Sequence, residues 1–344
     1  MLASVIIVSY NGKDQVRACL ASVLATLPAN CEVIVVDNAS VDGSPDMVAG
    51  SFPSVRLIRS ETNTGFGCAN NLGVTHAKGE FVVFVNPDTV AKAGWLDPLL
   101  TMLQQDANAG LVTGKLLRPD SRINTCGNDI HLTGLTLCRG LGDESIAYNR
   151  VEEVNAISGA LFATRRQLFE HIGGFDEAMF LYMEDTDLSW RIRLAGWRCL
   201  FTPASVVVHD YELRFAPLKV FYQERNRYLM LLKNLRSATW LVLLPSLLLA
   251  EVVTWGFVFT RDRRNWRNKL RAYVWVIRHW SMVMDKRRRA QTQRKIRDRD
   301  LIARTIWQLD FGQVSQGVAG QLATVVFNPL FGLFWLITRG VVWW

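Results

Sequence analysis

The sequence predicts an α/β protein in which a mostly parallel sheet, covered by helices on both faces, is followed by a helical region. Three observations predict it: β-branched runs alternate with helical periods up to residue 209, polar residues follow several of these runs, and the composition then changes. The 344 residues are 49% hydrophobic and 20% charged, which excludes a disordered or collagen-like chain.

Four short apolar runs, at residues 4–9, 32–36, 55–58 and 81–85, are predicted to be strands. Apolar residues recur at helical spacing over 16–27, and a second short helix is expected over 70–76. Strands alternating with helices indicate parallel pairing, and such sheets bind ligands at the carboxyl ends of their strands.

The chain divides near residue 215, into a sheet domain over 1–215 and a helical, basic, membrane-associated region over 216–344. Residues 217–236 read as an amphipathic helix. The apolar runs 240–260 and 318–344 approach or exceed the ~20 residues that span a bilayer. Pro245 and Glu251 interrupt the first run and Pro329 the second, which equally suits re-entrant or interfacial segments.

The net charge of +8 belongs to one segment. Residues 261–304 hold 16 Lys/Arg and 4 Asp/Glu, and nine of the twelve tryptophans lie at or after Trp240. Basic clusters beside Trp-rich apolar runs predict binding to anionic membrane lipids. A nucleic-acid-binding protein that grips phosphates through residues 286–299 is the alternative, and the apolar runs argue against it, so no nucleic-acid partner is expected.

The six cysteines form no CxxC pair, so neither a zinc site nor a redox motif is implied, and a reducing compartment is expected. No signal-peptide pattern precedes the first strand, which places the expected location at the cytoplasmic face of the membrane. The oligomeric state is not readable from the sequence.

Polar residues follow the first two predicted strands. Ser9, Tyr10 and Asn11 end the first strand, and Asp37 and Asn38 end the second. A carboxylate and amides at adjacent strand ends can hydrogen-bond a nucleobase and ribose, with the Tyr10 ring available to stack. An Asx turn leading into a helix is the alternative for the second loop.

The loop after the predicted strand 81–85 contains Asn86, Pro87 and Asp88. A carboxylate there can hold Mg²⁺ or Mn²⁺ together with diphosphate oxygens, since Mg²⁺ commonly uses only one or two protein carboxylates. His209, which ends an apolar run, is a candidate nitrogen ligand beside such a metal. A turn at Asn86 and a core histidine are the alternatives.

The segment 64–71 contains a GxG element, but it precedes a strand and has Asn70 where a third glycine is required. A dinucleotide-binding fingerprint is therefore rejected. A Gly-rich turn that closes over a nucleotide is expected instead, with Asn71 among the donor-binding residues.

Three carboxylates, Glu184, Asp185 and Asp187, precede or open a predicted helix that ends before Gly196. Acidic residues at a helix N-terminus complement its dipole, the role expected of Asp187. Glu184 and Asp185 follow an apolar, aromatic lead, so one of them is a candidate general base.

The order of these motifs carries a family resemblance. The stretches SVIIVSYNG, VVDNASVDGS, NTGFGCANNLG, FVNPDT, SGALFATRR, GGFDEAMFLYMEDTDLSWR and VVVH together resemble family 2 glycosyltransferases of the Rossmann-like GT-A fold over residues 4–209. The NPD and NNxG versions are most similar to bacterial rhamnosyltransferases that build cell-envelope polysaccharides.

The resemblance implies an inverting sugar transfer from a nucleotide-diphosphate sugar, assisted by a divalent metal. By motif position, Asp37 and Asn38 would contact the nucleoside and Asp88 the metal, with His209 as a candidate second ligand of the same metal. Asp185 would be the base. The usual DxD is replaced by Asn86-Pro87-Asp88, which leaves one carboxylate for the metal.

The predicted reaction moves a sugar, L-rhamnose from its dTDP donor, to a polyprenyl-diphosphate-linked acceptor. Arg225 and Arg227 are candidate ligands of the acceptor diphosphate. A processive polysaccharide synthase using a UDP-sugar is the alternative enzyme, disfavoured because two short apolar stretches do not readily form a polymer channel and no QxxRW-like motif is present.

Overall fold

The computed structural model describes residues 1–210, 217–261, 263–313 and 318–344. Its contacts divide the chain into two compact units. The sheet unit contains residues 1–128, 138–192 and 197–213, and the helical unit contains residues 129–137, 193–196 and 214–344. The predicted boundary at residue 215 falls within 211–216, outside the described residues, and the two short segments assigned to the helical unit were not predicted.

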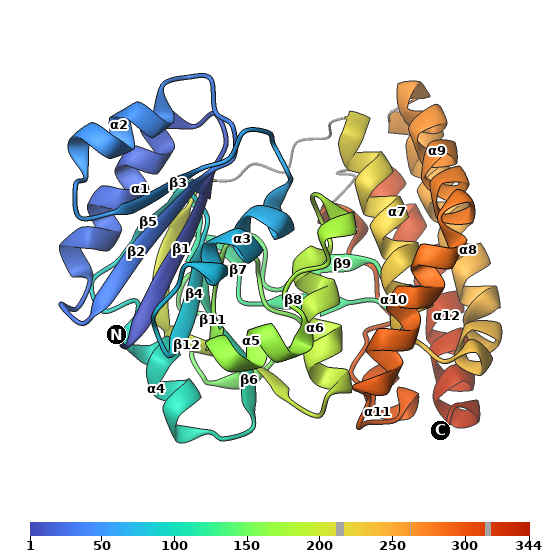
Figure 1. Ribbon diagram of the computed structural model, residues 1–344. Helices are drawn as coiled ribbons and strands as arrows, with labels where there is room; N and C mark the ends of the chain where they lie inside the picture. Colours follow the sequence, from blue (N-terminus) through green and yellow to red (C-terminus); the bar gives the residue numbers. More distant parts are fainter. Residues whose placement is uncertain (211–216, 262, 314–317) are drawn as a thin grey trace. The chain divides into compact units, whose positions relative to one another are not determined.

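The described part of the sheet unit contains a ten-stranded mixed sheet with the central order β10-β12-β6-β11-β4-β1-β2-β3 (Figure 1). The four predicted strands are present as β1 (Ala3–Ser9), β2 (Cys31–Asp37), β3 (Arg56–Arg59) and β4 (Phe81–Val85). Strand β1 pairs in parallel with β2 and β4, and β2 pairs in parallel with β3. The later strands are β5 (Thr89–Ala91), β6 (Ala109–Leu117), β7 (Ile123–Thr125), β10 (Glu152–Glu153), β11 (Leu161–Arg165) and β12 (Arg198–His209). Among them, β11 runs antiparallel to β4 and β6, while β12 is parallel to β6.

Two apolar layers hold the sheet unit together. One face of the sheet packs on α1 (Lys13–Thr26), α2 (Ser44–Ser51) and α4 (Asp97–Gln105), whose buried side chains join those of β1, β2 and β4 in one core. The other carries α3 (Phe66–Thr75), α5 (Arg166–Ile172), the 3-10 turn η1 (Glu177–Met179) and α6 (Glu184–Leu194). On this face Phe84 stacks on Phe162, and Phe175 meets both rings edge-on.

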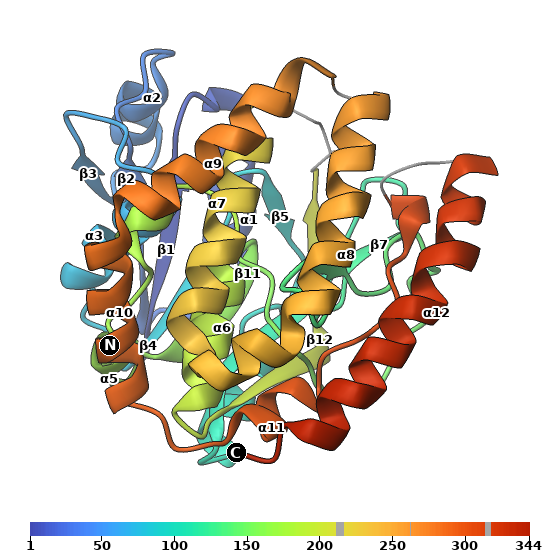
Figure 2. The same cartoon turned by 90° about the vertical axis from the view of Figure 1, so that its right-hand side faces the viewer.

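The helical unit is built from α7 (Pro217–Asn234), α8 (Ser237–Arg261), α9 (Trp266–Arg278), α10 (Trp280–Thr292), α11 (Asp298–Ile302) and α12 (Val318–Val341) (Figure 2). Short 3-10 turns, η2 (Arg263–Asn265) and η3 (Phe311–Gln313), connect some of them. A hairpin of β8 (Asn128–Ile130) and β9 (Thr136–Cys138) also contributes. Helices α8 and α12 continue through Pro245 and Pro329.

Helix α10 satisfies the carbonyl end of α7. Arg287 donates to the carbonyls of Leu232 and Leu235, and Gln291 donates to those of Lys233 and Asn234. These are the carbonyls that a helix leaves without intrahelical partners. Part of the basic segment is therefore used inside the protein.

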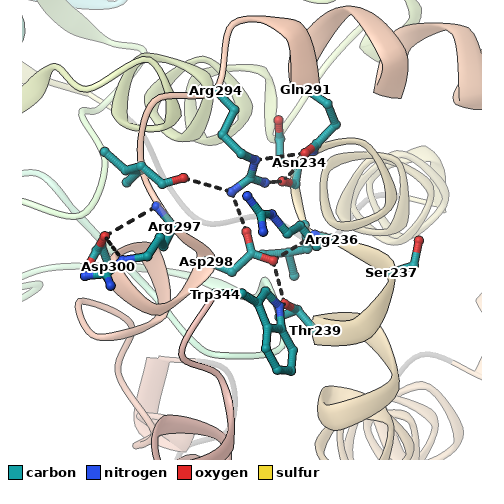
Figure 3. A network of polar contacts seen from close by, with 12 residues as sticks. Asn234, Arg236, Ser237, Thr239, Gln291, Arg294, Arg297, Asp298, Asp300 and Trp344 are labelled. Atoms are coloured by element: carbon teal, nitrogen blue, oxygen red, sulfur yellow. Dashed lines mark hydrogen bonds and ion pairs between the residues drawn. The ribbon is translucent and has the colours of Figure 1, made fainter.

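Asp298 completes this junction (Figure 3). Its fully buried carboxylate accepts from the Arg236 amide at 2.8 Å, from Thr239 Oγ1 at 2.5 Å and from the Arg294 guanidinium at 2.6 Å. Trp344 Nε1 donates to the same Thr239 hydroxyl at 2.8 Å. A buried charge is tolerated when it is paired and hydrogen-bonded in this way.

Candidate active site

The carboxyl ends of β1, β2 and β4 bring Ser9, Asp37 and Asn86 to the same edge of the sheet. Asp37 is buried, and its Oδ2 accepts from the Ser40 amide at 3.1 Å. Asp37 Oδ1, Ser9 Oγ and Asn86 Oδ1 are buried without a hydrogen-bond partner among the described residues. Buried polar atoms are normally paired, so this edge is ready to receive a polar ligand.

The loop after β1 is tied to the loop after β2. The Asn11 amide donates to Ser40 Oγ at 3.0 Å, and Asn11 Oδ1 accepts from the Val41 amide at 2.8 Å. Asn11 has a φ of 51°, a conformation that asparagine tolerates better than most residues. Tyr10 is 52% exposed, so its ring remains available for stacking.

The side chain of Asn38 is bonded to the turn at residues 63–65. Its Nδ2 donates to Asn63 Oδ1 and the Gly65 carbonyl, and its Oδ1 accepts from the amide and hydroxyl of Thr64. These four bonds use the full capacity of an asparagine amide. Asn38 therefore shapes the turn at residues 63–65, and this arrangement does not support direct contact with the nucleoside.

Asn71 also acts as an internal clamp. Its amide accepts from the Phe175 amide at 2.9 Å and donates to the Phe175 carbonyl at 3.0 Å and to Glu177 at 3.2 Å. These bonds hold the segment leading to Glu184, and they do not support the predicted role of Asn71 as a donor ligand. The partner residues lie about a hundred positions away, so the sequence gives no local signal for this bond.

The Gly-rich turn packs backbone to backbone against this same segment. The Phe66 amide donates to the Phe180 carbonyl at 2.7 Å. Gly65 has a φ of +87°, and a Cβ there would lie 2.4 Å from the Phe180 carbonyl oxygen. Only glycine fits this close approach. The turn thus supports the loop before α6, a contact that the predicted closure over a nucleotide did not anticipate.

Asp88 and His209 are brought together from separate strand ends. His209 Nε2 lies 3.3 Å from Asp88 Oδ1, and His209 Nδ1 is 3.1 Å from Asn124 Oδ1. Because an amide oxygen only accepts, Nδ1 donates to it and Nε2 is directed at the carboxylate. Asn124 had no signal in the sequence.

This pair fits part of a divalent-metal site. Asp88 Oδ1 is buried without a hydrogen bond among the described residues, and oxygen and imidazole donors suit Mn²⁺ and, through the carboxylate, Mg²⁺. Over the described ranges no group of three or more His, Cys, Asp or Glu gathers as a metal cluster. Remaining ligands would come from elsewhere, as the single carboxylate of the NPD loop predicts.

Glu184, which is buried, and Asp185, which is half-buried, open α6. Asp185 Oδ2 accepts from the Gly159 amide at 2.9 Å, and Oδ1 accepts from the Thr186 amide at 2.7 Å. Burial raises the pKa of Asp185 above its ordinary value, although these amides act in the opposite direction. Burial, together with the nearby Asp185 charge, raises the pKa of Glu184 to about 8. Its Oε2 is buried without a partner among the described residues.

The backbone before these carboxylates is strained. Phe180, Tyr182 and Met183 have φ values of 59°, 67° and 70°, in the left-handed region that side chains disfavour. Such outliers cluster at functional sites and persist when the surroundings enforce them. Asp187 lies outside this group, because it forms a fully buried ion pair with Arg191 at 2.8 Å.

Arg225 and Arg227 belong to the helical unit. Arg227 is 1% exposed and pairs with Glu224 at 2.8 Å and Glu251 at 2.7 Å, so its predicted contact with an acceptor diphosphate is not supported. Arg225 is also buried, with its guanidinium 4.5 Å from the centre of the Trp275 ring. Both side chains are engaged within their own unit.

The mixed, mostly parallel sheet with polar groups at the ends of its strands is the architecture of the GT-A fold. The chain belongs to glycosyl transferase family 2, whose profile matches residues 4–173. The predicted family and fold are thus confirmed, and glycosyltransferase activity follows from them.

Two curated relatives illustrate the range of similar proteins. The chain is 30% identical over 230 residues to an N-acetylglucosaminyl-diphospho-decaprenol L-rhamnosyltransferase of Mycobacterium tuberculosis, covering 60% of this chain and 75% of that protein. It is 30% identical over 234 residues to human polypeptide N-acetylgalactosaminyltransferase 3, covering 61% and 36%.

Among solved structures, the crystal structure of GalNAc-T7 with UDP, GalNAc and Mn²⁺ is similar, with a TM-score of 0.57 and 19% identity. The match covers 67% of this chain and 47% of that one, and it supports the fold assignment.

Proposed function

We propose that this protein transfers L-rhamnose from dTDP-rhamnose to a polyprenyl-diphosphate-linked glycan acceptor, with inversion, at the cytoplasmic face of the membrane. The observation that carries the chemistry is the half-buried Asp185 carboxylate, oriented by two backbone amides in the unit that also presents Asp88 and His209. The sugar and the acceptor are taken from the similarity to the mycobacterial enzyme, whose name specifies a diphospho-decaprenol acceptor and rhamnosyl transfer. The dTDP part of the donor is carried over from the family resemblance of the sequence motifs.

In the proposed reaction Asp185 accepts the proton of the acceptor hydroxyl at a carboxylate oxygen. The hydroxyl attacks the anomeric carbon from the face opposite the leaving diphosphate, so a single displacement inverts the centre. The raised pKa of the half-buried Asp185 makes its carboxylate a stronger base than one in water.

Asp88 and His209 would hold the Mg²⁺ or Mn²⁺ ion. When bound, this ion supplies positive charge that neutralises the leaving diphosphate. The carboxylate of Asp37 and the hydroxyl of Ser9 would bind the nucleoside part of the donor, since their free oxygens lie at adjacent strand ends. Tyr10 would contribute an exposed ring for stacking.

A donor and acceptor screen tests the proposal. The purified full chain is incubated with a short-prenyl GlcNAc-diphosphate acceptor and either dTDP-rhamnose or a UDP-sugar, and the product linkage is determined by NMR. We expect transfer from dTDP-rhamnose with an inverted anomeric centre. Preference for a UDP-sugar overturns the donor assignment, and retained configuration overturns the single displacement.

The helical unit is proposed to keep the enzyme at the membrane through anionic lipids. Two of its helices, over Ser237–Thr260 and Gly320–Val341, are long and apolar enough to cross a membrane. Helices of this length and composition either cross a bilayer or lie within one leaflet.

A further inference from the structure

Helices α8 and α12 each leave an apolar stripe exposed. Their candidate spans have mean hydropathies of 2.0 and 1.5, yet only 28% and 17% of these windows are buried. The side chains exposed on α8 and α12 include Leu241, Leu244, Leu248, Val252, Phe259, Leu322, Val325, Leu333, Leu336 and Ile337. Contiguous apolar surface on this scale marks an interaction site.

Helix α9 exposes apolar and basic side chains together. Trp266, Leu270, Val274 and Ile277 lie about one turn apart and are 40%, 42%, 43% and 71% exposed. Arg267, Arg271 and Arg278 of the same helix, and Arg263 and Arg264 just before it, are also exposed. An exposed apolar stripe flanked by arginines is typical of a helix that lies in a membrane interface.

A cluster of buried charges joins α8 to its neighbours. Glu251, near the middle of α8, accepts from Arg227 of α7 at 2.7 Å and contacts Lys269 of α9 at 3.1 Å. Glu224 of α7 contacts Arg227 at 2.8 Å and Lys269 at 3.3 Å. Tyr273 donates to both glutamates. Within this cluster, Glu224 and Glu251 each form ion pairs with both Arg227 and Lys269.

This cluster fixes the position of α9 along the axis of α8. Lys269 meets the middle of α8, so Arg267 and Arg271, two positions on either side, are near the same level. If α8 crossed a bilayer, both exposed arginines would face hydrocarbon near its midplane. Placing charged side chains there is costly, and they normally face a protein interior or water.

We propose that the helical unit binds one leaflet of an anionic phospholipid bilayer through the exposed faces of α8, α9 and α12, and that α8 lies in this leaflet without crossing it. The inference rests on the proposed function only in that a polyprenyl-linked acceptor brings the enzyme to a membrane. Helix α8 packs against α9 and α12, so the three stripes belong to one helical layer (Figure 2).

The positive charge of the helical unit favours anionic lipids. Residues 261–304 carry 16 Lys/Arg against 4 Asp/Glu. Lys269, Arg287 and Arg294 are engaged inside the protein, so the lipid contacts fall to the exposed arginines around α9. Exposed arginines beside tryptophan match the phosphates of an anionic leaflet.

The topology of α8 tests the first half of the proposal. Ala238→Cys and Thr260→Cys place a thiol at each end of α8, in a background with Cys31, Cys68 and Cys138 replaced by serine. Membrane vesicles with the cytoplasmic face outward are treated with an impermeant maleimide before and after detergent. We expect both thiols to react without detergent. If one end reacts only after detergent, α8 crosses the bilayer and the proposal is wrong.

Flotation tests the lipid contact. Full-length protein is mixed with vesicles of phosphatidylcholine with or without phosphatidylglycerol. The Arg264→Glu/Arg267→Glu variant should bind the anionic vesicles at least about tenfold more weakly, because each basic side chain near the surface adds to the attraction. The control Arg17→Glu/Arg150→Glu makes the same charge change at exposed positions of the sheet unit.

Circular dichroism is used as a control to check that both variants are folded. Equal loss in the two variants, or full-length protein that does not float with anionic vesicles, contradicts the proposal. Neither experiment measures sugar transfer. A failed donor screen therefore leaves this inference intact, and a failed topology test leaves the proposed reaction intact.

Discussion

The backbone amide of Gly159 donates to Asp185 Oδ2 at 2.9 Å, while the Thr186 amide holds the other carboxylate oxygen at 2.7 Å. Ser189 Oγ also donates to the Asp185 carbonyl at 2.7 Å, which adds a bond within the first turn of α6. The carboxylate is thus oriented from a strand-flanking loop and from its own helix. An oriented base is already in position for proton transfer.

Replacing Asp185 with asparagine should reduce turnover by about 10² to 10⁴ or more, because the proton acceptor is lost while the shape is kept. Binding of the donor, measured by calorimetry with dTDP-rhamnose, should be unchanged. Asp120→Asn, which alters an exposed carboxylate paired with Arg118, serves as the control. Near-normal turnover in Asp185→Asn would transfer the role to Glu184.

Asp88→Ala should abolish metal-dependent activity, and a chelator should do the same to the unchanged protein until Mn²⁺ or Mg²⁺ is restored. A direct readout is binding of Mn²⁺ in the presence of dTDP, followed by electron paramagnetic resonance. We expect Asp88→Ala and His209→Ala both to weaken this binding, since their side chains lie 3.3 Å apart. Full activity in chelator would exclude a metal-assisted reaction.

Gly65→Ala should destabilise the protein and lower activity, because the added methyl meets the Phe180 carbonyl at 2.4 Å and the φ of +87° is unfavourable for alanine. The matched control is Gly50→Ala in α2, where a Cβ has nothing within 4 Å. Alanine in that helix should raise the free energy of unfolding by about 0.5–1 kcal/mol. Denaturant titration of both variants separates the two outcomes, and an undisturbed Gly65→Ala would contradict the close contact.

Glu184 should make stability depend on pH. Its pKa rises from 4.5 to about 8 in the folded protein, so between these values the native state binds more protons than the unfolded state. The free energy of unfolding should therefore decrease as pH rises from about 4.5 to about 8. The Glu184→Gln variant should lose this part of the slope, as measured by denaturant titration at several pH values. An unchanged slope would place the Glu184 carboxyl in a less buried environment.

The strands β1, β2 and β4 could be predicted because each is a short apolar run buried on both faces, and the residues that follow them mark the site edge. Six later strands of the sheet were not predicted. The internal roles of Asn38 and Asn71 could not. The partners of Asn38 lie 25 to 27 positions away and those of Asn71 lie 104 to 106 positions away. In the sequence, an asparagine whose side chain bonds to the backbone cannot be distinguished from one whose side chain binds a ligand.

Glu251 gives the same lesson for the helical unit. In the sequence it is a charge that interrupts an apolar run. Its meaning depends on Arg227 and Lys269, which come from other helices and meet it only after folding. The burial of Arg225 and Arg227, the two arginines predicted as diphosphate ligands, could not be predicted for the same reason, because burial and pairing are properties of the packed helices.

The end of α7 is bonded to residues that are synthesised much later, in α10 and α11. This affects the order in which the helical unit folds during synthesis. The bonds that Arg287, Gln291, Arg294 and Asp298 make with residues 232–237 join positions 50 to 62 apart. In the nascent chain, the last turn of α7 lacks these side-chain partners until Arg287 and Gln291 have been made. Contacts of such long range form late, and the apolar stripe of α8 is translated in the interval. The nascent chain therefore exposes α8, its most apolar helix, before α9 and α12, which pack against α8, have been synthesised.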